Sequence, residues 1–226
     1  MTFTDNVEIA IFCLGIISMI FYGITYFPQF YEIHSKKSAE GVSIWAVLLW
    51  TQADALSLTS SILLNLDQMI IIICWYHFFM DILMVACVLY YEKLKDKRMA
   101  SYSAIFIGAN ILTNILVNVI YYGFQNETQI LIGEIIAWIT TVIYILGRVP
   151  QILKLEKSIE GLSVLMYIFT ILGNSTYLAL LVLQDQHLAN LPWIVLGSCL
   201  ILLDIYVILR IHIKKQQQVS LNELVI

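Results

Sequence analysis

Long apolar stretches follow one another along this chain, and short polar connections separate them. An α-helix rises 1.5 Å per residue, so about 20 apolar residues are enough to cross the hydrocarbon core of a bilayer. A soluble protein would need an implausibly large core to bury all of these stretches. The pattern therefore predicts an all-α membrane protein with seven transmembrane helices, over residues 7–27, 42–64, 68–91, 101–123, 129–149, 162–183 and 191–211.

The composition agrees with a membrane protein. Hydrophobic residues make up 60% of the 226 positions and charged residues only 12%, whereas soluble domains average about 25% charged. The first apolar stretch is preceded by the acidic Asp5 and includes Glu8, and it lacks the basic flank of a signal peptide. We expect it to be retained as the first transmembrane helix.

The basic residues predict the orientation of the chain. On the seven-helix map, all of them fall between helices 1 and 2, between helices 3 and 4, around the connection of helices 5 and 6, or after helix 7. An excess of Lys and Arg marks the cytoplasmic side, so we expect a luminal or external N-terminus and a cytosolic C-terminus. The twelve residues are Lys36, Lys37, Lys93, Lys95, Lys97, Arg98, Arg148, Lys154, Lys157, Arg210, Lys214 and Lys215.

A short motif occurs twice. Pro28-Gln29 and Pro150-Gln151 each precede a similar heptad, KSAEGVS at residues 37–43 and KSIEGLS at residues 157–163. The chain has only three prolines, so two of them occupy this matched position. A duplicated motif at the ends of helices 1 and 5 predicts two equivalent halves.

Helices 1 and 5 would run in the same direction, so the two halves are predicted to be parallel repeats. Helix 4 must then return the chain between them. The expected architecture is three plus one plus three helices, with a first repeat at residues 1–100, a linker helix at 101–123 and a second repeat with a short cytosolic tail at 124–226. Asn110, Asn114 and Asn118 share one face of the linker helix and predict hydrogen bonds between helices.

The two Pro-Gln pairs are candidate hinges. Proline removes a backbone hydrogen bond from a helix, and in a membrane the freed carbonyl needs a local partner. We expect the amides of Gln29 and Gln151 to supply that partner, and Pro28 and Pro150 to let the cytoplasmic ends of their helices swing. In the heptads, glycine would permit a turn and Ser43 or Ser163 would cap the next helix.

Embedded acids are the candidate site residues. A carboxylate at a helix centre costs about 2.5–3.5 kcal/mol on insertion scales, so such groups face an aqueous cavity or carry a proton. No Lys or Arg is expected deep in a helix, and a cavity of this kind favours a cationic substrate and could relay protons. The predicted substrate and proton pathway consists of Asp54, Asp81, His77, Glu134, Asn174 and Asp204.

The matched heptads place Asp54 and Asn174 at equivalent positions. One half would then carry an ionisable group where the other carries a neutral amide. We expect the first half to couple protons and the second mainly to position substrate.

The chain resembles the PQ-loop family, and within it the lysosomal and vacuolar cationic amino acid transporters. The duplicated Pro-Gln supports the family. The subgroup is suggested by Trp50-x-x-x-Asp54, by Arg148-x-Pro150-Gln151 and, towards the C-terminal end, by residues 190–193 (NLPW) and 202–204 (LLD). The resemblance implies export of Arg, Lys or His from an acidic compartment to the cytosol by alternating access, and the embedded acids would permit proton coupling. It implies a lysosomal or vacuolar membrane, with a bacterial or other acidic-compartment membrane left open.

Other classes fit less well. A proton-coupled cystine exporter also matches the acids and is the main alternative, whereas a neutral sugar would not require them. A seven-helix ligand-binding receptor of the same superfamily would bind without flux. No enzyme motif, metal motif or cofactor motif is evident, and the expected partners are the bilayer, a small amino acid and protons, without nucleic acid.

Overall fold

The computed structural model describes residues 3–66, 68–92, 97–123, 127–184 and 190–224. All regular secondary structure in these ranges is helical. The helices are α1 (Phe3–Ile24), α2 (Tyr26–Lys36), α3 (Ile44–Leu63), α4 (Gln68–Tyr91), α5 (Lys97–Gly123), α6 (Glu127–Leu155), α7 (Val164–Leu183) and α8 (Leu191–Leu224). The predicted first helix is thus divided into α1 and α2, while each of the other six predicted helices corresponds to one element.

Six stretches of the described chain are long and apolar enough to cross a membrane, and the first of them joins α1 and α2. Helix α3 does not reach that apolarity, because Thr51, Asp54 and a serine- and threonine-rich second half interrupt it. These polar side chains are buried, since α3 packs against α4, α5 and α6. A helix surrounded by other helices can be more polar than one that faces lipid.

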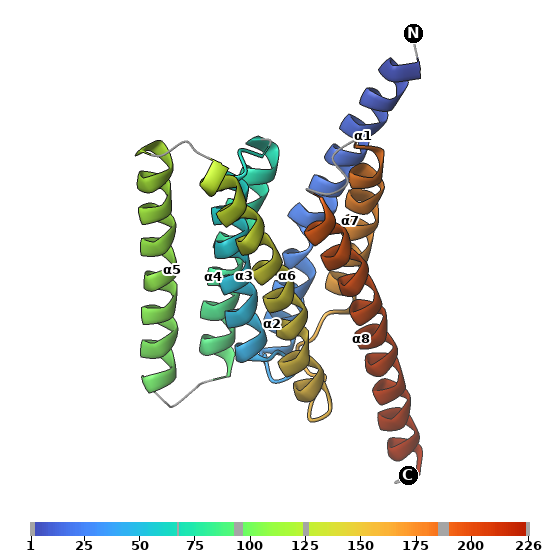
Figure 1. The fold of residues 1–226 in the computed structure, drawn as a ribbon. Helices are drawn as coiled ribbons and strands as arrows, with labels where there is room; N and C mark the ends of the chain where they lie inside the picture. The colour runs from blue at the N-terminus through green and yellow to red at the C-terminus, as the bar shows by residue number, and fades with distance from the viewer. Residues whose placement is uncertain (1–2, 67, 93–96, 124–126, 185–189, 225–226) are drawn as a thin grey trace.

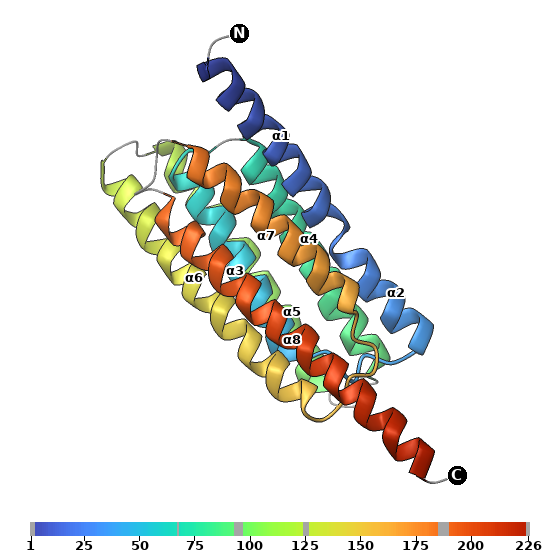
Figure 2. The same ribbon diagram turned by 90° about the vertical axis from the view of Figure 1, so that its right-hand side faces the viewer.

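The helices form a bundle whose N- and C-termini lie at opposite ends (Figure 1). Helix α3 packs along α6 and α1 packs along α7, so the segments before and after α5 meet at two helix pairs. Helix α8 lies against both α6 and α7 (Figure 2). The three-plus-one-plus-three division and the side on which each terminus lies stay predictions.

The predicted linker helix α5 stands at one edge of the bundle (Figure 1). The Thr59 hydroxyl of α3 donates a 2.8 Å hydrogen bond to the Asn114 side chain of α5. This confirms the predicted interhelical bond for Asn114, whereas the Asn110 amide donates to the backbone of its own helix. The side chain of Asn118 lies outside the described residues.

The two prolines have different local effects. Helix α1 ends at Ile24, and Pro28 lies in the first turn of α2, where a backbone N–H would have no partner within the helix anyway. Pro150 lies inside the continuous helix α6, where it leaves the Leu146 carbonyl without its usual donor. The regular helix is therefore interrupted at Thr25 in the first half, while α6 stays one helix.

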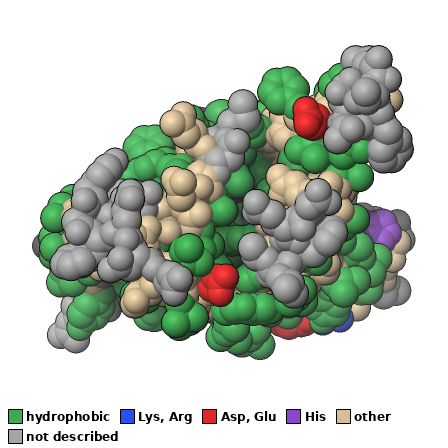
Figure 3. All heavy atoms as spheres, turned by 45° about the horizontal axis from the view of Figure 1, so that its top comes forward, with side chains coloured by type: hydrophobic (Ala, Val, Ile, Leu, Met, Phe, Trp, Pro, Cys, Tyr) green, Lys and Arg blue, Asp and Glu red, His purple; other side chains and the backbone are tan. Residues whose placement is uncertain are grey.

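The main apolar core lies at the end of the bundle that carries the two Pro-Gln pairs and the two heptads, called the Pro-Gln end below. Fully buried side chains from both halves meet there, including Ile33, Leu155 and Ile211. Outside the core, large hydrophobic side chains are exposed, for example Ile105, Tyr90 and Leu202. Figure 3 shows this apolar cover over most of the visible described surface, and such a surface suits contact with lipid.

Candidate functional site

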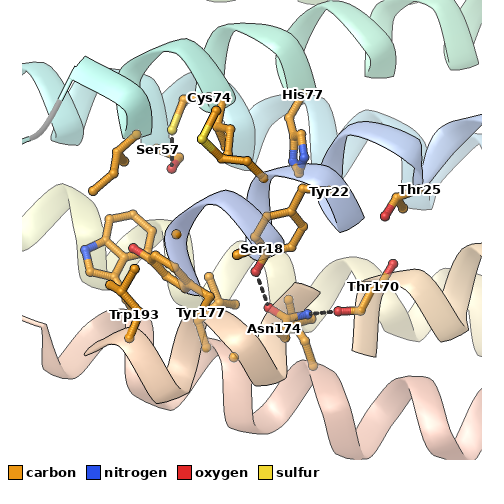
Figure 4. Close-up of a pocket in the computed structure, with 18 of the residues that line it drawn as sticks. Ser18, Tyr22, Thr25, Ser57, Cys74, His77, Thr170, Asn174, Tyr177 and Trp193 are labelled. Carbon is orange, nitrogen blue, oxygen red and sulfur yellow. Dashed lines mark hydrogen bonds between the residues drawn. The ribbon is translucent and has the colours of Figure 1, made fainter. Parts of the chain in front are cut away.

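A cavity of about 420 Å³ lies between the two halves. This volume falls in the range of about 300–1,000 Å³ found for small-molecule sites. Side chains from α1, α3, α4, α6, α7 and α8 line it, and Figure 4 shows several of them pointing inward, among them Ser18, His77 and Tyr177. The cavity is therefore a candidate site for one small molecule.

The cavity reaches the end of the bundle where the N-terminus lies. Glu8 of α1 is exposed there, and Gln184, directly after α7, is half-buried. At the other end the lining consists of the largely buried side chains Trp50, Arg148 and Met166. The cavity is thus accessible from the N-terminal end and closed towards the Pro-Gln end.

Two tyrosines hold matched positions across the cavity. Tyr22 and Tyr144 each lie six residues before their Pro-Gln proline. The Tyr22 hydroxyl donates a 2.9 Å hydrogen bond to the Asn174 amide oxygen, as Figure 4 shows, and the Tyr144 hydroxyl donates to the Asp54 carboxylate. Each tyrosine thereby binds the predicted site residue of the opposite half.

A second matched pair lies two residues before each proline. The Tyr26 hydroxyl donates to Asp81 at 2.7 Å, and Arg148 Nη2 contacts Asp204 at 3.0 and 3.1 Å. Both aspartates are fully buried. The expectation that no basic side chain lies deep in the bundle is therefore wrong. The sequence places Arg148 at the end of the predicted helix 129–149, next to the connection, but α6 continues to Leu155.

The first half concentrates unbalanced acids. Asp54 and Asp81 are both buried and interact with each other. His77 Nδ1 lies 3.9 Å from Asp54, a separation that allows an ion pair when the imidazole is protonated. Asp81 Oδ2 and His77 Nε2 are buried without a hydrogen-bond partner. In contrast to Asp204, this cluster has hydroxyl partners and a histidine but no permanent cation in contact.

The glutamines form a reciprocal clasp between the halves. Gln29 donates to the Gly161 carbonyl at 2.5 Å and accepts from the Ser163 backbone at 2.9 Å. Gln151 donates to the Gly41 carbonyl at 2.8 Å and accepts from the Ser43 backbone at 2.9 Å. The prediction that these amides serve the carbonyl freed by their own proline is wrong, because each amide binds the heptad of the other repeat.

The heptads also touch directly. The Gly41 N–H donates to the Glu160 carbonyl at 2.7 Å. Gly161 has a φ of +73°, and a Cβ there would lie 2.0 Å from the Ser38 carbonyl oxygen, so glycine is needed both for its conformation and for this approach. Ser43 caps α3 as predicted, whereas the Ser163 side chain makes no capping bond.

Three predicted site residues do not line the cavity. Asp81 and Asp204 are buried and bind two residues that do, Tyr26 and Arg148, whereas Glu134 is exposed on α6. Across the described residues, no group of three or more His, Cys, Asp or Glu side chains is placed to hold a metal ion. The roles of Tyr22, Tyr26 and Tyr144 were not predicted, although counting back from each proline pairs Tyr22 with Tyr144 and Tyr26 with Arg148.

These features define a multi-pass integral membrane protein with a ligand-sized cavity between two related halves. The family model described as PQ loop repeat matches residues 10–70 and 132–189, and the chain belongs to the PQ-loop family. The two matched segments each contain one Pro-Gln pair.

Curated relatives match most of the chain at low identity. The human lysosomal amino acid transporter 1 homolog is 26% identical over 84% of this chain and 78% of its own length. The vacuolar lysine transporter YPQ1 of Saccharomyces cerevisiae is 21% identical, covering 90% and 93%, and the vacuolar histidine transporter YPQ3 of that yeast is 20% identical, covering 87% and 89%. A eukaryotic SWEET transporter structure has the same fold, with a TM-score of 0.61, 12% identity and coverage of 89% and 98%.

Proposed function

We propose that this protein exports cationic amino acids from an acidic compartment to the cytosol by alternating access, with proton coupling through the first half. The observation that carries the proposal is the cavity between the repeats, with Asp54 and His77 in its wall and the buried Asp81 in contact with Asp54. The proposed location is the lysosomal or vacuolar membrane, as in the names of the lysosomal and vacuolar relatives.

The charge distribution supports a cationic side chain as cargo. No Lys or Arg of the described residues forms an ion pair with Asp54 or Asp81, and Arg148 acts on Asp81 only from a distance, so a bound guanidinium, ammonium or imidazolium would supply the balancing charge. Hydroxyl and amide groups of Tyr22, Tyr177 and Asn174 line the same cavity and offer hydrogen bonds to the polar backbone of an amino acid.

The closed end supports alternating access. The four glutamine bonds and the contact between the heptads hold the halves together at the Pro-Gln end, while the cavity is accessible at the other. Opening towards the cytosol would require these bonds to break and the halves to separate. Bending at Pro28 and Pro150 would serve as the hinge, and under the predicted orientation the state described here is open to the lumen.

Two adjacent buried carboxyls support proton coupling. Both cannot be ionised at low cost so close together, so one proton shared by Asp54 and Asp81 relieves their repulsion. The pair that shares one proton from the acidic lumen keeps one negative charge, which an arriving cationic cargo would balance. After the halves open towards the neutral cytosol, cargo and proton would both leave, and the acidic lumen would supply the next proton.

The test is uptake of labelled arginine, lysine, histidine, cystine and glucose into proteoliposomes, with and without a proton gradient. We expect saturable flux of at least one cationic amino acid, and acceleration when the side from which substrate enters is acidic. Flux of cystine alone would instead indicate the cystine exporter, and flux of glucose alone would refute the substrate class. Binding of arginine without any flux would indicate a receptor.

A further inference from the structure

The guanidinium of Arg148 lies in a cage formed by Trp50 of α3, Tyr167 of α7 and Asp204 of α8. Its central carbon is 4.7 Å from the Trp50 ring centroid and 5.7 Å from that of Tyr167. The same guanidinium contacts both oxygens of Asp204. A carboxylate beside aromatic faces is a general arrangement for binding guanidinium and ammonium ions.

The cage lies at the inner end of the cavity. Trp50 and Arg148 line the cavity itself, while Trp50 and Tyr167 also line a small void of about 10 Å³ whose other walls include Gln29 and Gln151. The cage therefore separates the open cavity from the glutamine clasp. Cargo that crosses from one end to the other must pass it.

The contacts of Arg148 in this cage are incomplete. Nη2 donates to Oδ2 of Asp204 and lies 3.0 Å from Oδ1, but Oδ1 is buried without a hydrogen-bond partner, whereas a full fork-to-fork pair uses two nitrogens for the two oxygens. Nε of Arg148 and the Tyr167 hydroxyl are buried without hydrogen-bond partners. Pro150, two residues further along, weakens the backbone bonding of the same helical turn. A side chain held in this way can leave the cage when α6 bends.

We propose that Trp50, Tyr167 and Asp204 form an inner cation site, which Arg148 occupies in the conformation described here and which takes the guanidinium or primary ammonium group of a substrate when Arg148 withdraws. The inference rests on the proposed transport of cationic amino acids and adds a second site to it. Arg148 then substitutes for the cargo, so that the buried Asp204 has a cation beside it before cargo arrives and after cargo leaves.

The test is binding of methylguanidinium to the purified full chain in detergent, measured by isothermal titration calorimetry. Removing the tethered guanidinium with Arg148→Ala should create one binding equivalent per chain beyond any that the wild type shows. The extra equivalent should disappear in Arg148→Ala/Asp204→Asn. Lys154→Ala is the matched control on the same helix, because it frees the Glu92 carboxylate, to which Lys154 donates at 3.3 Å, without an aromatic cage. It should add no equivalent.

The proposal fails if Arg148→Ala gains no equivalent, or if the extra equivalent persists when Asp204 is also changed. Arg148→Gln is prepared in parallel, and both variants are purified with and without methylguanidinium. If either variant folds only when methylguanidinium is present, this result supports binding of the probe in the cage. If neither variant folds even with the probe present, the cage does not bind it and the proposal is overturned.

Failure of the transport function would be recognised separately. Labelled arginine, lysine and histidine flux by the wild type tests the proposed function and does not involve the cage variants. An extra binding equivalent without cationic flux in the wild type would retain the cage and refute transport. Flux of cationic amino acids by the wild type, without the extra binding equivalent in Arg148→Ala, would retain transport and refute the cage.

Discussion

The two repeats use the same geometry with different chemistry. Tyr22 and Tyr144 both reach across the cavity from the position six residues before the proline, yet one meets the neutral Asn174 and the other the acidic Asp54. Two residues before the proline, the first repeat has Tyr26 and the second has Arg148. Each binds an aspartate of its own half, Asp81 or Asp204.

The difference separates two tasks that a symmetric pair of repeats would share. In the second repeat a permanent cation balances the buried acid, and the matched site position is an amide. In the first repeat each of the two carboxyls accepts a hydrogen bond from its own tyrosine hydroxyl, and a histidine lies beside Asp54. A change in proton number therefore has its largest electrostatic consequence in the first repeat, where no Lys or Arg of the described residues pairs with the carboxyls and Arg148 acts on Asp81 only from a distance.

Making the first repeat resemble the second should have the largest effect. Asp54→Asn keeps an acceptor for Tyr144 but removes the ionisable group, so we expect proton-stimulated uptake of cationic amino acids to fall by about tenfold or more, as loss of a buried charge partner costs several kcal/mol. Proteoliposome uptake with and without a proton gradient measures this. Asn174→Asp is the mirror-image variant, and equal losses of proton stimulation in both would contradict the division of tasks.

Removing the Arg148 guanidinium from the second repeat should destabilise the fold more than removing the matched Tyr26 hydroxyl from the first. Arg148→Ala leaves Asp204 buried and unpaired, with an expected cost of about 3–5 kcal/mol in free energy of unfolding. Tyr26→Phe removes one hydrogen bond to Asp81 and should cost about 1 kcal/mol. Thermal unfolding in detergent compares the two. Partial recovery of stability in Arg148→Ala/Asp204→Asn is the accompanying control, and a Tyr26→Phe loss as large as that of Arg148→Ala would refute the distinction.

Loss of either glutamine of the clasp should weaken the contact between the two repeats to a similar extent. Gln29→Ala leaves the Ser163 N–H without its acceptor, and Gln151→Ala does the same to Ser43. Each loss should cost about 1–3 kcal/mol locally. Hydrogen exchange should accelerate by about tenfold at the heptad opposite the changed glutamine. Acceleration confined to the heptad of the same repeat would show that the cross-repeat bonds do not hold the end closed.

The prolines should differ in their effect on transport. Pro150→Ala restores a donor for the Leu146 carbonyl inside α6 and stiffens that helix, so uptake should slow by a few-fold. Pro28 occupies a first turn, and Pro28→Ala should slow uptake less. Uptake rates of both variants, normalised to the amount of folded protein, provide the comparison. If both transport at the wild-type rate, neither proline acts as a hinge.

The smallest effect is expected at Glu156, outside the membrane-spanning segments. A hydrogen bond from Arg210 lowers the pKa of this exposed carboxyl, with the charges of Arg210 and Lys214 adding to the effect. Because the pKa in the folded protein is lowered, the stabilisation is present above the unfolded value of about 4.3 and is lost as pH falls through the folded value. Glu156→Gln should change Tm by only about 1 °C at pH 7 and by less at acid pH. A larger change in Tm at acid pH than at pH 7 would contradict a lowered pKa for Glu156.

Some of the site could be predicted from single residues, and some could not. Asp54, Asp81, Asn174, Asp204 and His77 stand out because polar groups are rare in apolar helices, and the structure places all of them near the cavity or its inner end. Glu134 has the same sequence signal but is exposed on α6. Apolar context alone does not tell which side of a helix faces the partner half.

The sequence by itself determined the membrane class, the helical segments and the duplication, because span length, apolarity and a repeated Pro-Gln heptad are local properties of the chain. Only the tertiary structure decided that Gln29 and Gln151 bind the opposite repeats, that Arg148 lies buried against Asp204, and that the helix is interrupted before Pro28 but continues through Pro150. These outcomes depend on which helices pack together. A buried amide or guanidinium must take the partner that the neighbouring helix presents, and this partner is distant in the chain.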